Sequence, residues 1–197
     1  KKELLMIPGV TSRRRFSDLS EQEILALAIS SEEDDARIYR SYAELLREDY
    51  PDSAHVFDGM AEEEDGHRQR LIDLHQKRFG NVIPLIRREH VAGFYARRPV
   101  WLIENLGIDR IRDEAAAMER DAERFYLNAA ARTSDADTRK LLGDLAAAES
   151  KHETRAEELE AEHLDAESRA AEEKTAKRQF LLTWVQPGLA GLMDGSV

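Results

Sequence analysis

Residues 61–67, with the sequence AEEEDGH, lie in a stretch that predicts a helix and decides the fold. Glu64 and His67 are three residues apart, so on a helix they are neighbours on one face. Four apolar residues spaced by three and four positions share that face: Phe57, Met60, Leu71 and Leu74. Burying a carboxylate and an imidazole there without partners would cost several kcal/mol. A metal ion is the first partner to consider.

The same Glu-x-x-His pattern recurs downstream, at Glu149 and His152, again between apolar residues. Two further predicted helices each carry one glutamate on an otherwise apolar face. These are Glu32 and Glu119, and each is followed at the same interval by a tyrosine, Tyr39 and Tyr126 respectively. The second half of the chain thus repeats the first, which predicts two helical hairpins that each supply half of one site.

Helix start and stop signals divide most of the chain into four helices. Residues 20–23, SEQE, form a capping box that predicts the first helix start. The Tyr50-Pro51 step ends that helix and starts the second, which Gly80-Asn81 should terminate. Asp109 is a plausible cap for the third helix, and Thr133-Ser134-Asp135 reads as a turn before the fourth. The predicted helices span residues 20–49, 51–80, 109–132 and 135–180.

The connector over residues 80–108 is long for a loop, which suggests that it crosses the molecule. In a four-helix bundle, one such crossover lets the third helix run parallel to the second. The predicted fold class is therefore all-α: a four-helix bundle with a long crossover between helices two and three and an extended fourth helix. At about 1.5 Å per residue, the four glutamates lie near the same mid-height of their helices.

Composition limits the class of function. A length of 197 residues suits one domain with a real core. The formal net charge of −11 argues against nucleic-acid binding through a basic surface and favours the approach of cations. The chain has no cysteine, which excludes disulfides, zinc fingers, iron–sulfur clusters and thiol nucleophiles.

Four carboxylates in an apolar interior cannot all stay ionised without cations, and two divalent metals with two imidazoles would resolve this. The predicted ligands are Glu32, Glu64, His67, Glu119, Glu149 and His152. Glu33 is a rival for Glu32, although the apolar stripe and the tyrosine spacing favour Glu32. Glu62 and Glu63 read as a solvated face. A structural helical protein without metal is the plain alternative.

These motifs resemble the rubrerythrin/ferritin-like superfamily across residues 20–165, and in particular the erythrin-type domain of the membrane-bound ferritin A family. The resemblance implies that Glu64 and Glu149 bridge two metals, with Glu32 and Glu119 as terminal carboxylates. It also implies that His67 and His152 each bind one metal. Two iron ions are the expected cofactor, with manganese or zinc as substitutes.

The same resemblance implies that Tyr39 and Tyr126 orient carboxylates from outside the ligand set. Rubrerythrins carry a further glutamate where this chain has Ala122, so it stays open whether Glu33 or Glu123 joins the ligands. The tail at 187–195, PGLAGLMDG, looks like the opening of the first membrane helix of a vacuolar-iron-transporter-type domain.

The expected organisation is therefore an N-terminal arm at 1–19, the ferritin-like domain at 20–165, a helical stalk at 166–180 and the start of a truncated membrane segment at 181–197. In the full-length protein the domain would lie at the cytoplasmic face of the cell membrane, whereas this fragment would be soluble.

The predicted function is a ferroxidase-type one: the domain binds Fe(II) and oxidises it with O2 or H2O2, as part of a membrane iron exporter. One alternative is a non-catalytic iron or manganese sensor that gates the transporter. A rubrerythrin-like peroxide reductase is another, disfavoured because the cysteine-ligated iron module of rubrerythrins has no counterpart here. The amphipathic stretch after Glu157 predicts a homodimer, with helix exchange between protomers as one form of it.

Overall fold

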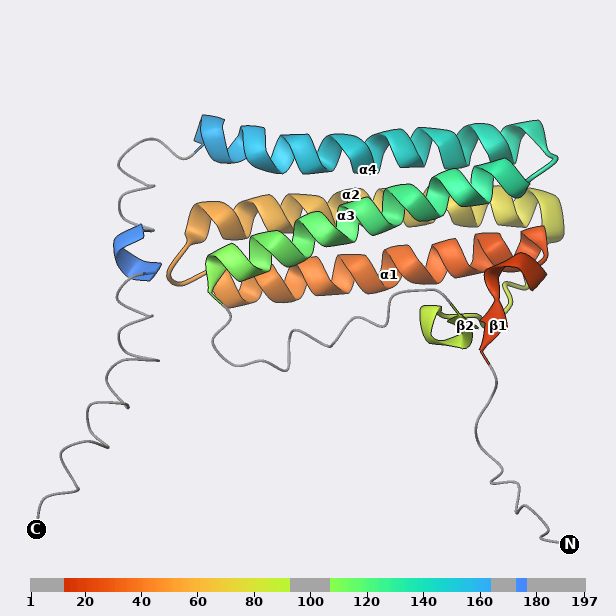
Figure 1. The fold of residues 1–197 in the computed structure, drawn as a ribbon, viewed down its shortest axis with the longest axis horizontal. Helices are drawn as coiled ribbons and strands as arrows, with labels where there is room; N and C mark the ends of the chain where they lie inside the picture. The colour runs from red at the N-terminus through yellow and green to blue at the C-terminus, as the bar shows by residue number, and fades with distance from the viewer. Residues whose placement is uncertain (1–12, 93–106, 164–172, 177–197) are drawn as a thin grey trace, which may run out of the picture.

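The computed structural model describes residues 13–92, 107–163 and 173–176, except the side chains of Asp109 and of residues 152–163. Within these ranges four long helices lie side by side (Figure 1). Their bounds are α1 Glu21–Leu46, α2 Pro51–Phe79, α3 Ile108–Arg132 and α4 Ala136–His163. The all-α four-helix bundle predicted from the sequence is confirmed.

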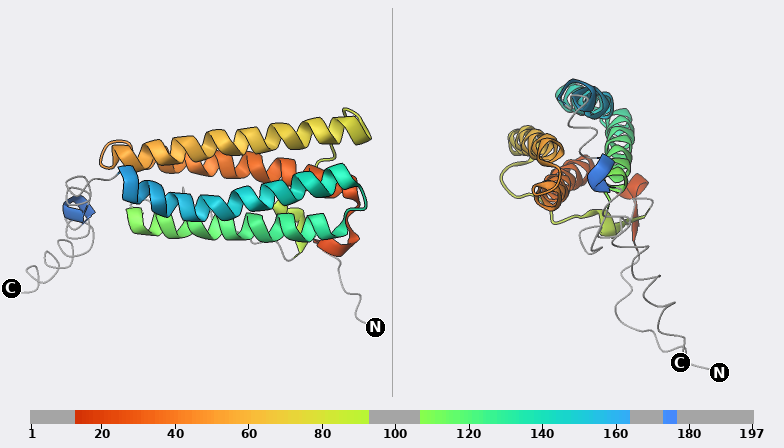
Figure 2. Two further views of the ribbon diagram at one scale, coloured as in Figure 1. Left: turned by 90° about the horizontal axis from the view of Figure 1, so that it is seen from above. Right: turned by 90° about the vertical axis from the view of Figure 1, so that its left-hand side faces the viewer.

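The four helices form two antiparallel hairpins, α1 with α2 and α3 with α4, as the two views of Figure 2 show. In Figure 1, α2 and α3 run in the same direction, which is the arrangement that the long connector predicted. The start of this connector includes the short turn η2 (Arg88–His90) and the strand β2 (Val91–Ala92). Both lie on the α1 side of the bundle.

Local sequence signals account for the helix ends. The Ser20 side chain accepts a hydrogen bond from the Glu23 backbone N–H, and the Glu23 carboxylate accepts one from the Ser20 N–H, which completes the predicted capping box. Pro51 occupies the first turn of α2. Gly80 ends that helix with φ of 84°, a conformation that favours glycine. The Asp135 carboxylate accepts a 2.8 Å bond from the Thr138 N–H and caps α4.

Two local expectations were wrong. Helix α1 ends at Leu46 instead of residue 49, because the chain tightens into a turn before the Tyr50-Pro51 step. Helix α3 begins at Ile108 with Gly107 at its N-cap position, so Asp109 does not cap it. Part of the predicted N-terminal arm has regular structure: β1 (Arg14–Arg15) pairs in parallel with β2, and η1 (Phe16–Asp18) follows it.

Several predicted segments lie outside the described residues. These are residues 1–12 of the arm, most of the stalk at 166–180 and the whole tail at 181–197. The continuation of the fourth helix beyond His163 therefore stays a prediction, although residues 173–176 form a helical turn. In the part of the chain that the structure describes, no helix combines the length and apolar character needed to cross a bilayer.

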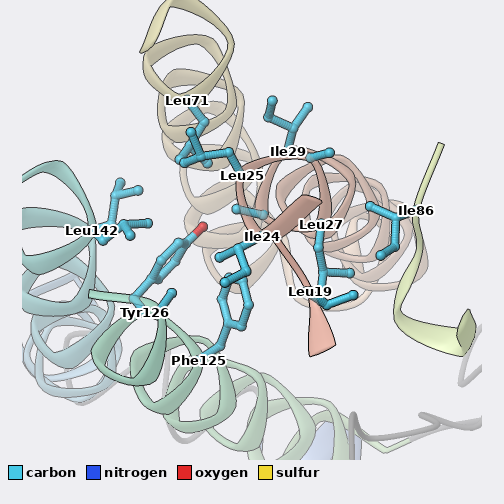
Figure 3. Packing of buried hydrophobic residues seen from close by; sticks show 14 of the residues in the cluster. Leu19, Ile24, Leu25, Leu27, Ile29, Leu71, Ile86, Phe125, Tyr126 and Leu142 are labelled. Carbon is cyan, nitrogen blue, oxygen red and sulfur yellow. The ribbon is translucent and has the colours of Figure 1, made fainter. Parts of the chain in front are cut away.

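The core consists of two apolar clusters at successive heights along the bundle. One cluster includes Leu25 of α1, Leu71 of α2, Tyr126 of α3 and Leu142 of α4, which face one another in Figure 3. The other lies nearer the α1–α2 turn and is built from these residues among others: Tyr39, Tyr42, Phe57, Met60, Ile111 and Met118. Buried glutamates lie between the two clusters on α1, α2 and α3 and directly after the α4 residues of the first cluster, and they form the candidate site.

One stretch of α1 is buried on every side, since residues 24–29 are all buried. Helix partners cover part of this surface, and the connector covers another part. Ile86 and Val91 of the connector are buried in the same cluster, and Ser30 Oγ donates a 2.8 Å hydrogen bond to the Ile86 carbonyl. The connector therefore acts as a further packing element against the helix that carries Glu32.

Candidate metal centre

Each helix places one glutamate in the polar layer between the two apolar clusters. Glu32 of α1, Glu64 of α2, Glu119 of α3 and Glu149 of α4 are all at most 3% exposed. Their common level agrees with the mid-height predicted from the sequence. Carboxylates are almost never buried to this extent unless a partner compensates their charge.

His67 lies at the centre of three of these carboxylates. Its Nδ1 atom is 3.1 Å from Glu149 Oε1, 3.3 Å from Glu64 Oε2 and 3.6 Å from Glu32 Oε2. The imidazole itself is buried, with 4% exposure. The Glu-x-x-His pair of α2 thus faces both hairpins, as the helical spacing of Glu64 and His67 predicted.

The spacing of these atoms fits a metal shell. One ligand atom from each of Glu32, Glu64, His67 and Glu149 lies within 4.8 Å of the others. Ligand atoms bound at about 2.0–2.2 Å to one ion lie at most roughly 4.4 Å apart, so small side-chain movements would close the shell. Carboxylate and imidazole ligands are those that iron and manganese accept, whereas copper(I) prefers sulfur.

The electrostatics of the cluster also fit a cation. Burial, followed by the charge of Glu64, raises the pKa of Glu32 well above its ordinary value. Burial likewise raises the pKa of Glu149, although a hydrogen bond with His67 opposes this. Burial alone would lower the pKa of His67, but hydrogen bonds with Glu149 and Glu64 outweigh it and raise the pKa to about 9. Bound protons therefore compensate part of the buried negative charge that metal ions would otherwise compensate.

Two tyrosines connect the hairpins through hydrogen bonds to the same carboxylates. Tyr39 of α1 donates to Glu119 Oε1 of α3, and Tyr126 of α3 donates to Glu32 Oε1 of α1. Both tyrosines are 1% exposed. Burial and the charge of Glu119 raise the pKa of Tyr39, so this hydroxyl keeps its proton and remains a donor. The crossed pair reproduces the internal repeat of the sequence in three dimensions.

Glu119 is not one of the four residues whose ligand atoms all lie within 4.8 Å of one another. It belongs to the same polar layer, since its charge contributes to the raised pKa of Glu149. The side chain of His152, the sixth predicted ligand, lies outside the described residues, although its backbone belongs to α4. The structure therefore brings five of the six predicted side chains into one buried layer.

The other glutamates near the motifs are more exposed than the four in the polar layer. Glu33 forms ion pairs with Arg37 at 3.3 Å and Arg68 at 3.8 Å, and its side chain is 40% exposed. Glu62 and Glu63 are exposed, as expected for a solvated face, and Glu123 is half-buried. Among the histidines outside the motifs, His75 is buried and packs against Phe79, whereas His55 and His90 are exposed.

Sequence reasoning missed one element of the site, a buried ion pair beside Glu32. Asp35 is 6% exposed, and its carboxylate binds the guanidinium of Arg88 from η2. Burial would lower the pKa of Arg88, but the charge of Asp35 raises it above its ordinary value. The position of Asp35, one turn from Glu32, was available from the sequence. The partner was not, because it comes from the connector.

Comparisons with known proteins agree with this geometry. The family model for rubrerythrin matches residues 23–160, which is more than two thirds of the chain and includes every predicted ligand. Among solved structures, the chain is similar to a hypothetical protein, Pfu-1136390-001, from Pyrococcus furiosus, with 25% identity and a TM-score of 0.57. That similarity covers 72% of this chain and 89% of the other. The search of curated proteins gave no match. From the extent of the family match, the chain belongs to the rubrerythrin family.

Proposed function

We propose that this chain binds a pair of iron ions in its polar layer and oxidises Fe(II) with O2 or H2O2. The observation that carries the proposal is the convergence of three carboxylates on one buried imidazole nitrogen, within 3.1–3.6 Å. A further buried carboxylate, Glu119, lies in the same layer. Without cations, this concentration of buried acidic groups has no evident structural benefit.

The resemblance to rubrerythrins suggests that Glu64 and Glu149 would each hold both ions. In support, both are buried, and each has a carboxylate oxygen within 3.3 Å of His67 Nδ1. Glu32 and Glu119 would each hold one ion, and their tyrosine partners fix the orientation of the carboxylates. His67 and His152 would supply the nitrogen ligands. Manganese and zinc suit the same donor set.

When bound, an iron pair supplies two electrons, one from each Fe(II), which with two protons reduce O2 to H2O2 or H2O2 to two waters. The residues of this chain bind the ions, exclude water and hold protons nearby. The raised pKa values of His67, Glu32 and Glu149 favour the protonated forms of these three side chains in the metal-free protein. Metal binding would release these protons, because ligands must be deprotonated.

Stopped-flow oxidation of Fe(II) by the purified chain tests the proposal. We expect oxidation faster than in buffer, with two Fe(II) consumed rapidly per chain, under O2 or H2O2. Glu149→Ala should abolish the rapid phase, whereas Glu63→Ala, which changes an exposed neighbour of Glu64, should keep it. Tight binding of two ions without rapid oxidation would favour the metal-sensing alternative over an enzyme.

We further propose that the domain serves a membrane iron transporter, at the cytoplasmic face of the cell membrane. The support is the sequence resemblance at residues 187–195, which lie outside the described residues. Iron efflux from cells that express a longer protein with this domain is the direct test. The Glu149→Ala variant should lose efflux, and an unchanged efflux rate would count against the link.

We also propose that the chain forms a homodimer. Rubrerythrin family membership and the amphipathic stretch after Glu157 support it. In one form of the dimer, the two chains would exchange helices. The hydrogen bonds of Tyr39 and Tyr126, which connect the two hairpins, would then connect hairpins of different chains. Light scattering after size-exclusion chromatography should give twice the 22.5 kDa mass of one chain. A single-chain mass would contradict the dimer.

A further inference from the structure

The connector after α2 is attached to α1 over the turn that carries Glu32. Ser30 Oγ donates to the Ile86 carbonyl at 2.8 Å, and β2 pairs with β1 directly after η2. Ile86 and Val91 are buried against the same end of α1. The backbone of Arg88 is therefore held close to the polar layer by contacts on both sides.

All three guanidinium nitrogens of Arg88 donate hydrogen bonds to this turn of α1. Its Nε donates to Ser31 Oγ at 2.9 Å, and one terminal nitrogen donates to the Ser31 carbonyl at 3.2 Å. The two terminal nitrogens also bind the two carboxylate oxygens of Asp35, one of them at 2.9 Å. The Arg88 side chain is 16% exposed and that of Asp35 is 8% exposed. Planar, bidentate contacts of this kind fix orientation as well as charge.

Ser31 and Asp35 lie on either side of Glu32 in the sequence of α1. Arg88 therefore holds the helix directly before Glu32 and one turn after it. Tyr126 holds the carboxylate of Glu32 from α3. The two contacts together restrict both the helix turn and the side chain of a proposed ligand.

Asp35 is also a further buried acid beside four others. Its charge contributes to the raised pKa values of Glu32 and Tyr39, which shows that it acts on the polar layer. The Arg88 charge acts on Glu32 in the opposite direction. With Arg88 in place, Asp35 is neutralised locally, and the four glutamates remain to match the charge of two divalent ions.

We propose that Arg88 is a positioning residue of the metal centre, which fixes the Glu32 turn of α1 and holds Asp35 out of the ligand set. This inference rests on the proposed metal centre. It assigns a role at the site to the connector, a segment from which no ligand is proposed. Loss of Arg88 would leave Asp35 free to compete for a cation and would loosen Glu32.

Binding of Co(II) to the full chain, followed by its visible spectrum and by calorimetry, tests this role. We expect Arg88→Gln to weaken binding at least tenfold, in the range seen for outer-shell partners, and to alter the Co(II) bands. Arg88→Gln combined with Asp35→Asn should recover part of the affinity, because the competing carboxylate is gone. Arg87→Gln is the matched control: Arg87 is the preceding residue, and its guanidinium pairs at 3.5 Å with Asp34, a 25% exposed side chain outside the proposed ligand set.

A merely structural role for Arg88 would lower the melting temperature but leave the Co(II) bands and the affinity of the folded protein unchanged, and that result would overturn the inference. Should Arg88→Gln fail to fold, Arg88→Lys gives the same readout, because lysine keeps the charge but lacks the planar fork. Altered bands would support the inference, and unaltered bands would contradict it. Failure of the unsubstituted chain to bind Co(II) would instead contradict the metal centre itself.

Discussion

The hydroxyl of Tyr126 on α3 donates a hydrogen bond to the Glu32 carboxylate on α1, and the reciprocal bond joins Tyr39 on α1 to Glu119 on α3. The two hairpins are thus joined at their centre by polar contacts between equivalent residues of the internal repeat. A pseudo-twofold site results, in which each hairpin supports a carboxylate of the other.

Tyr126→Phe removes the donor to Glu32 and leaves a ring of nearly the same shape. We expect a loss of stability of about 1–3 kcal/mol, because a buried carboxylate oxygen loses its partner. Metal affinity should fall by roughly ten- to a hundredfold. Chemical denaturation and calorimetry with Mn(II) measure these effects. Tyr42→Phe, which removes a buried hydroxyl one helical turn beyond Tyr39, is the control, and an equal loss of affinity there would contradict the assigned role.

Metal ions should stabilise the fold by mass action. At a free concentration one hundred times the dissociation constant, binding adds about 2.7 kcal/mol to the free energy of unfolding. Anaerobic Fe(II) or Mn(II) should therefore raise the Tm of the chain by several degrees. Glu64→Ala should abolish this increase, and Glu62→Ala should preserve it because Glu62 is exposed. An increase of equal size in both variants would place the binding elsewhere.

The metal-free protein should lose stability as the pH rises from about 6.5 toward 9. The pKa of His67 is raised from 6.5 to about 9, so the folded chain holds this proton more tightly than the unfolded chain. The resulting stabilisation is complete below 6.5 and is lost as the pH approaches 9. The raised pKa values of Glu32 and Glu149 act in the same direction. Thermal unfolding across this range measures the slope, which His67→Gln should reduce, and a Tm that rises with pH would contradict it.

Ser20→Ala separates fold stability from metal binding. The Ser20 hydroxyl caps α1 far from the polar layer, and replacing such a cap costs about 1 kcal/mol. We expect a lower Tm with an unchanged affinity for Mn(II). Loss of affinity in this variant would mean that metal binding reports only on global stability.

The four helices could be predicted from the sequence because the signals that start and stop them are local. Capping at Ser20, the break at Pro51 and the stop at Gly80 are each properties of a few neighbouring residues. The polar layer was also predictable, because helical periodicity places Glu64 and His67 on an apolar face. The repeat then indicated that Glu32 and Glu119 share their level.

The connector was not predictable in the same way. The pairing of Arg14 with Val91 and the contact of Arg88 with Asp35 depend on the path of a segment that has no periodicity. Asp35 itself resembles any polar residue of a charged helix until its partner is known. Long-range contacts made by irregular segments have no local signature, so this part of the site required the structure.

The central claim is that two cations bind in the polar layer between the two apolar clusters. An anomalous difference map from crystals grown with Fe(II) or Mn(II) tests it directly. We expect two peaks among Glu32, Glu64, His67, Glu119 and Glu149, at a site that Tyr39 and Tyr126 flank. An empty polar layer in metal-loaded crystals, or peaks confined to the exposed acidic surface, would contradict it.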